Sequence, residues 1–227
     1  MADDKSGGTQ VHGEGQGDFE LGTPAIVCRW RLSGGSLPLE NRHLRALLAR
    51  TGNGKRVTKQ LVAWAKQHIE WTLAEGSIGH ADGVLMVVID CDGKAAMTVG
   101  DYQPLTERHL SQLCQRAISS RDEAFVCGVA PEVLCAIDGE TLVMGLPAGE
   151  RSAGAASLVE DLARTIGMPI ERREDLAAEI TEGRARYDEV FLVSDEHGIV
   201  AAEGRDGSCS MRMREGYQRL LERERGK

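Results

Sequence analysis

The chain has 227 residues, of which 41% are hydrophobic and 27% are charged, a balance that is ordinary for a globular protein of one or two domains. The formal net charge of −8 argues against a nucleic-acid partner, because binding to phosphates requires a basic surface. No apolar run is long enough to span a membrane and the first residues do not resemble a signal peptide, so we expect a cytoplasmic protein with no membrane partner.

The predicted elements begin after a polar tail. Residues 1–20 have almost nothing to bury, which predicts a disordered segment that includes His12. Residues 24–32 (PAIVCRWRL) have the pattern of a strand and end at a glycine turn. A helix, a second helix, a buried strand and its hairpin partner follow over residues 37–50, 56–75, 83–91 and 94–102.

A second pattern begins at Pro104, and helices and strands alternate in it as well. The expected helices cover residues 105–117, 153–166, 174–184 and the segment that reaches the C-terminus. The expected strands cover residues 123–128, 132–137, 141–146, 188–194 and 199–204. We therefore predict an α+β protein with a smaller domain over residues 21–103 and a larger one over residues 104–227.

Several patterns that could indicate a catalytic or metal site fail on spacing. The segment TGNGK lacks the first glycine of a phosphate-binding loop, since Ala49 stands there, and it follows a helix instead of a strand. Ser194, Asp195 and His197 are too close in sequence to form a hydrolase triad, so a polar turn is the simpler interpretation. The six cysteines form no CxxC pair and no zinc spacing, which indicates reduced thiols that fill the core.

Three stretches, taken in order, resemble one known family. They are VCRWRLSGGSLPLENRHLRAL, RDEAFVCG with the hairpin after it, and residues 157–207, which include DEVFLVS. They are similar to motifs of the class IV aminotransferases, the fold-type IV pyridoxal phosphate (PLP) enzymes that include branched-chain and D-amino acid aminotransferases and aminodeoxychorismate lyase. The resemblance covers about residues 24–220 and implies a two-domain fold-type IV architecture with a truncated N-terminal start, a homodimer, and a small-molecule cleft between the domains.

The resemblance also implies where the cofactor would be held, and other residues stand at those positions. The lysine that forms the Schiff base would fall near Tyr102, and the nearest lysine is Lys94, eight positions upstream at a hairpin turn. No lysine occurs between residues 95 and 226. The acid that contacts the pyridine nitrogen falls on Cys127, and the asparagine of the same motif falls on Glu132. A thiol cannot keep that nitrogen protonated as a carboxylate does.

The phosphate-binding positions implied by the resemblance differ as well. The threonine falls on Ala155 and the arginine of H-L-x-R-L falls on Ala46, although Arg45 would replace it after a shift of the helix register. His43 matches the histidine of that motif, and Ser194 is the nearest match to a second hydroxyl group. Arg31 would point into the cleft as a carboxylate anchor or lie on an exposed face.

These observations leave three hypotheses. In the first, which we favour, the fold is retained without PLP and the cleft binds a different small molecule. This hypothesis includes cofactor-independent chemistry on an amino-acid-like or carboxylate substrate. In the second, the chain is an active PLP-dependent aminotransferase or lyase with a relocated lysine. In the third, it is a non-catalytic binding or structural subunit. The candidate catalytic residues are Cys127, Tyr102 and Lys94, and the candidate substrate-binding residues are Arg31, His43, Arg45, Glu132 and Ser194. A buried thiol such as Cys127 is more often inert than nucleophilic.

Overall fold

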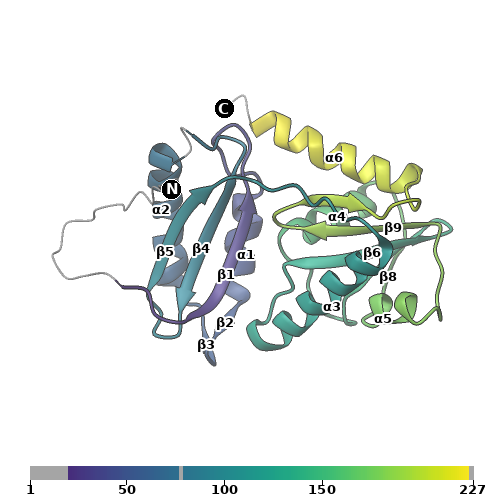
Figure 1. The fold of residues 1–227 in the computed structure, drawn as a ribbon, viewed down its shortest axis with the longest axis horizontal. Helices are drawn as coiled ribbons and strands as arrows, with labels where there is room; N and C mark the ends of the chain where they lie inside the picture. Colours follow the sequence, from purple (N-terminus) through teal and green to yellow (C-terminus); the bar gives the residue numbers. More distant parts are fainter. Residues whose placement is uncertain (1–19, 77–78, 225–227) are drawn as a thin grey trace, which may run out of the picture.

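The computed structural model describes residues 20–76 and 79–224, whose two main β-sheets stand side by side, each with its own helices (Figure 1). The predicted disordered tail, apart from Glu20, lies outside the described residues, as does His12. Both cavities described below lie at or near the junction of the two sheets. The candidate functional site is therefore sought at this junction.

The smaller sheet is antiparallel and has the strand order β1-β4-β5. Its elements are β1 (Pro24–Arg31), α1 (Glu40–Ala49), β2 (Thr51–Gly52), β3 (Lys55–Arg56), α2 (Lys59–Gly76), β4 (Val84–Asp90) and β5 (Ala95–Gly100). Leucines of α1 and the buried Ala65 and Ile69 of α2 pack on alternate residues of β1 and β4, which include Cys28 and Trp30. Burial of these apolar side chains is what holds both helices to the sheet.

The larger sheet has the order β10-β9-β6-β7-β8, with β7 and β8 parallel and the other pairs antiparallel. Its elements are α3 (Leu110–Cys127), β6 (Glu132–Asp138), β7 (Thr141–Met144), α4 (Gly154–Thr165), β8 (Ile170–Arg172), α5 (Leu176–Thr181), β9 (Glu189–Ser194), β10 (Gly198–Ala201) and α6 (Ser208–Glu224). Helices α4 and α6 pack on one face, and α3 and α5 pack on the other.

Strand β6 shows why this sheet requires helices on both faces. Val133, Cys135 and Ile137 belong to the cluster under α4 and α6, whereas Leu134 and Ala136 belong to the cluster under α3 and α5. Successive side chains of a strand point to opposite faces, so the unbroken apolar run of residues 133–137 in β6 is stable only when both faces are covered.

The main difference from the predicted elements is at residues 123–128. The expected strand is wrong, because α3 continues through this segment and ends at Gly128, which has a φ of 86°. The buried residues Ala117, Ser120, Ala124 and Cys127 recur at helical spacing, and Phe125 points outward with 93% of its surface exposed. Strand β8 was not predicted, and the loop TGNGK forms the small β2–β3 hairpin.

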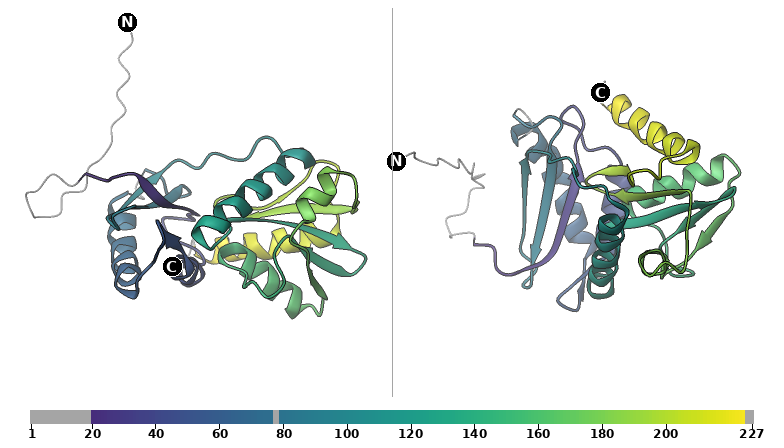
Figure 2. Two further views of the ribbon diagram at one scale, coloured as in Figure 1. Left: turned by 90° about the horizontal axis from the view of Figure 1, so that it is seen from below. Right: turned by 45° about the vertical axis from the view of Figure 1, so that its right-hand side comes forward.

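Several contacts join the two sheets. Residues 101–109 form an extended connection that crosses from β5 to α3 (Figure 2). Arg29 of β1 forms a bidentate ion pair with Glu196, which follows β9. Helix α1 packs against α4. The hydroxyl group of Ser33 donates to the carbonyl oxygen of Leu221 in α6, so the last helix reaches from the larger sheet to the smaller one.

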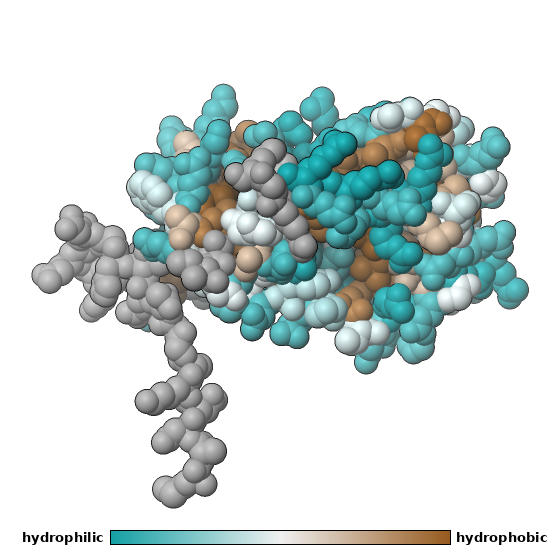
Figure 3. Space-filling view, turned by 90° about the horizontal axis from the view of Figure 1, so that it is seen from above, coloured by the Kyte–Doolittle hydropathy of each residue, from teal (hydrophilic) through white to brown (hydrophobic). Residues whose placement is uncertain are grey.

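Hydrophilic residues cover most of the face seen from above, where apolar residues show through as separate strips (Figure 3). No helix within the described residues is long and apolar enough to cross a membrane. The described residues also contain no group of histidine, cysteine, aspartate or glutamate side chains that could hold a metal ion.

Candidate functional site

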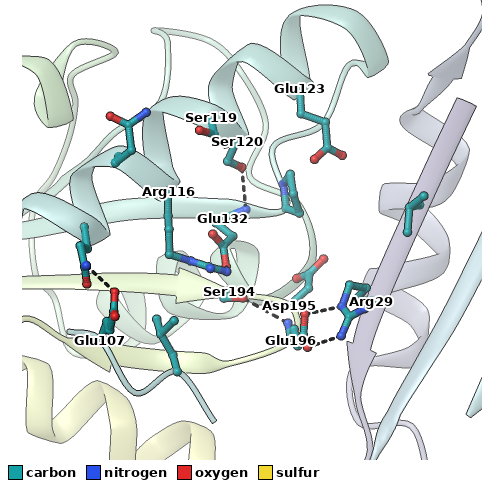
Figure 4. A pocket seen from close by; sticks show the side chains of 15 residues that line it. Arg29, Glu107, Arg116, Ser119, Ser120, Glu123, Glu132, Ser194, Asp195 and Glu196 are labelled. Atoms are coloured by element: carbon teal, nitrogen blue, oxygen red, sulfur yellow. Dashed lines mark hydrogen bonds and ion pairs between the residues drawn. The ribbon is translucent and has the colours of Figure 1, made fainter. Parts of the chain in front are cut away.

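A cavity of about 620 Å³ lies at the junction, between β1 on one side and α3 and the ends of β6 and β9 on the other (Figure 4). We call it the acidic cavity, because its lining contains two arginines and five carboxylates, a formal charge of −3. The charged residues are Arg29, Glu107, Arg116, Glu123, Glu132, Asp195 and Glu196. Its size is within the range of cavities that hold small molecules in proteins.

Both arginines of the acidic cavity are bound to carboxylates. Arg116 Nη2 lies 2.6 Å from Glu132 Oε1, and Arg29 Nε and Nη2 lie 2.6 and 2.7 Å from the two oxygens of Glu196. Burial alone would raise the pKa of Glu196, but the hydrogen bond from Arg29 and the charges of His197, Arg29 and Arg116 together outweigh it and lower the pKa. Glu196 is therefore ionised at neutral pH, and the pair connects the two sheets across the cavity.

Asp195 forms part of the wall of this cavity and occupies the start of α4. It is 7% exposed, and its Oδ1 accepts a hydrogen bond of 2.7 Å from the backbone N–H of Ala155. Gly154 leaves room for the carboxylate: a Cβ atom there would lie 2.1 Å from Oδ1, and the residue has a φ of 49°. His43 Nδ1 is 3.7 Å from Oδ2. The positive end of α4 is thus already neutralised by an internal anion.

A buried arginine lies behind the same wall. Arg50 is 2% exposed, and its Nη1 is 2.9 Å from Glu123 Oε1 and 3.0 Å from Cys127 Sγ. Burial alone would lower the pKa of Arg50, but Cys28, Cys127 and Glu123 raise it above its ordinary value. Burial also raises the pKa of Cys28 to about 11, against the opposing effect of Arg50. Arg50 therefore remains a cation among thiols.

A second cavity, also of about 620 Å³, lies between α1 and the segment that leads into α4. We call it the basic cavity, because its charged lining residues are Arg42, Arg45, Glu150 and Arg151, a formal charge of +2. Gly154 lines the basic cavity and Asp195 lines the acidic one, so these two touching residues separate the cavities.

The structure brings some of the predicted site residues together and separates others. Glu132 and Ser194 line the acidic cavity, and Arg45 lines the basic one. The hydroxyl oxygen of Ser194 accepts hydrogen bonds from the backbone N–H groups of Glu196 and His197, so it shapes the turn after β9.

Four of the other predicted residues line neither cavity. His43 is buried and stacked on Trp30, with ring centroids 5.1 Å apart. Arg31 lies over the ring of Tyr102, with 3.5 Å between its Cζ and the ring centroid, and Tyr102 has a pKa raised by burial against the opposing effect of Arg31. Cys127 is 3% exposed at the end of α3.

Lys94 also lines neither cavity. It lies in the turn between β4 and β5, next to Asp90, which pairs with Pro24 at the far end of β1 from Arg31. Its Nζ is 3.0 Å from the carbonyl oxygen of Glu20. The side chain thus contacts the chain that precedes β1.

The residues that sequence analysis missed are Asp195, Arg29, Arg116, Glu123 and Glu196. One signal was available for Arg29, since Arg29 and Arg31 alternate with Trp30 on a predicted strand and therefore share a face. Asp195 was interpreted as part of a polar turn, and no local pattern connects it with its partner Ala155, which is 40 residues away in sequence.

The fold is similar to that of several proteins of known structure. The structure matches the branched-chain amino acid aminotransferase of Escherichia coli, with a TM-score of 0.59 and 11% identity over 87% of this chain and 86% of that one. It also matches 4-amino-4-deoxychorismate lyase from Pseudomonas aeruginosa, with a TM-score of 0.55 and 16% identity over 86% and 90% of the two chains. The chain has the fold of the fold-type IV PLP enzymes.

A third fold-type IV match is the PLP-bound form of a hypothetical aminotransferase from Mycobacterium tuberculosis, with a TM-score of 0.57 and 13% identity over 92% of this chain and 94% of that one. No protein-family model and no curated protein sequence matches the chain. The predicted α+β fold-type IV architecture is therefore confirmed by structure at sequence identities that show the fold alone.

Proposed function

We propose that this chain is a small-molecule-binding protein that uses the fold-type IV scaffold without PLP. The observation that supports this most directly is the carboxylate of Asp195 on the first turn of α4. A helix N-terminus is a favourable place for a phosphate group, because its free N–H groups and its dipole both attract anions. Here a side chain of the protein already takes that place, and a phosphate beside it would meet a buried like charge.

The remaining residues do not fit the cofactor either. The lysines of the described residues, Lys55, Lys59, Lys66 and Lys94, line neither cavity, so none is placed to form a Schiff base there. The cation of Arg50 lies against Cys127, the position that the resemblance assigns to the acid for the pyridine nitrogen. A cation at that position would oppose protonation of the nitrogen, whereas a carboxylate would favour it. We therefore assign no step to PLP.

The acidic cavity supports an amino-acid-like ligand. Its net negative lining favours an ammonium group, and Glu132 and Glu196 offer carboxylate oxygens in that lining. Arg116, which is 37% exposed at its side chain, would meet a carboxylate group of the ligand while it keeps its bond to Glu132. We propose binding as the function, with Glu132, Ser194 and Arg116 as the contacts.

The experiment that tests this function combines PLP with a search for the natural ligand. We expect purified protein mixed with PLP to show no aldimine absorbance, and borohydride to leave no pyridoxyl group on any lysine by peptide mass spectrometry. An aldimine band that disappears in Lys94→Ala would overturn the proposal in favour of an active PLP enzyme. Native mass spectrometry should show a co-purified small molecule whose occupancy falls in Glu132→Gln.

We also propose, from the resemblance, that the chain forms a homodimer and that it consists of two domains that meet near residue 103. Light scattering gives the mass in solution and tests the first of these. Expression of residues 104–227 alone tests the second, because an independent domain would show cooperative unfolding.

A further inference from the structure

The five carboxylates of the acidic cavity differ in what stabilises their charge. Glu132 and Glu196 are each bound to an arginine of the lining, and Glu123 Oε1 lies 2.9 Å from Nη1 of the buried Arg50. Asp195 accepts from a backbone N–H group at the start of α4, where the helix dipole favours an anion. Groups of the protein therefore stabilise four of the five carboxylates.

Glu107 is the fifth carboxylate, and it forms no ion pair with any residue in the part of the chain that the structure describes. It is exposed on the connection between the sheets, and its Oε2 accepts a hydrogen bond from Gln112 Nε2 on α3. This bond fixes the orientation of the amide, because the reversed amide would bring its oxygen against the carboxylate. The amide oxygen, Gln112 Oε1, is buried and accepts no hydrogen bond within the described residues. Glu107 and Gln112 thus offer adjoining acceptors to a cation with several N–H donors, such as an ammonium or guanidinium group.

The position of this pair on α3 determines which ligand can reach it. Gln112 and Arg116 are four residues apart and both line the cavity, so they are separated by about 6 Å along the helix axis. Arg116, which we propose above as the contact for the carboxylate group of the ligand, is thus one helical turn from the Glu107–Gln112 pair. A side chain of three or four methylene groups, with C–C bonds of about 1.5 Å, spans that distance. Leu105 lines the same cavity and offers an apolar surface to those methylene groups.

We propose that the acidic cavity selects an amino acid with a cationic side chain, and that Glu107 and Gln112 bind the distal ammonium or guanidinium group. This selectivity rests on the function proposed above and adds a side-chain class to it. The charge of the cavity supports it, because the formal −3 of the lining becomes −2 when the cation of Arg50, which pairs with Glu123, is included. An amino acid with a neutral side chain is a zwitterion without net charge, whereas a cationic side chain adds one positive charge that this lining attracts.

Isothermal titration calorimetry of the full chain with lysine and norleucine tests this selectivity, because the two amino acids differ only in the terminal amine. Both enantiomers of each are used. We expect lysine to bind about tenfold more tightly than norleucine. Glu107→Gln should reduce the affinity for lysine to that for norleucine and leave norleucine binding unchanged. The matched control is Glu140→Gln, which removes an exposed carboxylate at the opposite end of β6 from Glu132 and should change neither affinity.

A second variant tests the location without a change of charge. Gln112→Ala removes the adjoining acceptor, so it should weaken lysine binding while norleucine binding and the thermal unfolding midpoint are kept. Equal affinities of wild type for lysine and norleucine would overturn the selectivity, as would an equal loss in Glu140→Gln or a loss of both ligands in Glu107→Gln. In each of these cases norleucine binding to wild type would still support the function proposed above. Failure of both ligands to bind wild type would overturn the amino-acid-like ligand together with its side-chain class.

Discussion

Replacement of Asp195 by alanine should reveal the anion-binding character of the first turn of α4. The substitution removes the oxygen that accepts from Ala155 N–H and leaves that buried donor without a partner. A hydrogen bond to a charged group is worth about 1.5–3 kcal/mol. The backbone N–H and C=O groups of Asp195 bond to Pro131 and Arg31, and these bonds remain. The side chain alone is therefore tested.

A loss of about 2 kcal/mol corresponds to a fall of about 4–8 °C in the thermal unfolding midpoint for a chain of this size. Asp195→Asn keeps an acceptor and loses only the charge, so its midpoint should fall by about half as much. Differential scanning fluorimetry measures both variants against wild type. The informative addition is sodium phosphate, which should raise the midpoint of Asp195→Ala more than that of wild type, because only the variant has a vacant anion position on the helix.

Two outcomes would refute this account of Asp195. If Asp195→Ala unfolds at the wild-type temperature, the carboxylate contributes nothing to the helix. If phosphate stabilises wild type and variant equally, its effect comes from the general surface instead of the start of α4. Sodium chloride at the same ionic strength is the control for screening.

Three further predictions use the same measurements. Gly154→Ala should destabilise by about 2 kcal/mol or more through backbone strain and contact with Asp195, and the double variant with Asp195→Ala should recover part of the loss. Burial lowers the pKa of His197 below 6.5, against the opposing effect of Glu196, so as the pH falls the unfolded state binds this proton before the folded state does. The thermal unfolding midpoint should therefore fall as the pH drops below about 6.5. The fall should be smaller in His197→Gln. Iodoacetamide should modify Cys28, with its pKa of about 11, far more slowly than the half-buried Cys91, as peptide mass spectrometry of the native protein would show.

Much of the fold could be predicted because strong local patterns decide it. Continuous apolar runs predicted the strands β4, β6 and β9, and apolar residues at helical spacing predicted the helices α1, α2 and α4. The predicted strand at residues 123–128 was wrong because the apolar residues of this segment resemble a strand of the family. The spacing of Ser120, Ala124 and Cys127 instead continues a helix. A single stretch can satisfy both patterns, and packing against β6 decides between them.

The candidate site was predictable only in part, for a related reason. Glu132 and Ser194 were found because they stand at the ends of predicted strands that also carry family motifs. The contacts of Asp195 with α4 and of Arg50 with α3 join residues 40 and 73 positions apart, and no local pattern specifies such pairs. The family motifs indicated which positions in the chain to consider, whereas the residues that contact those positions are known only from the structure.

The bond from Ser33 to Leu221 joins residues 188 positions apart, and the Arg29–Glu196 pair joins residues 167 apart. The smaller sheet is therefore synthesised long before the groups that fix it against the larger sheet leave the ribosome. During that interval β1 has its own antiparallel partner β4, but the residues that will line the acidic cavity have no opposite wall. During synthesis the cavity therefore cannot be completed until the segment after β9 has emerged, and a ligand that bridges the two walls would act after that point.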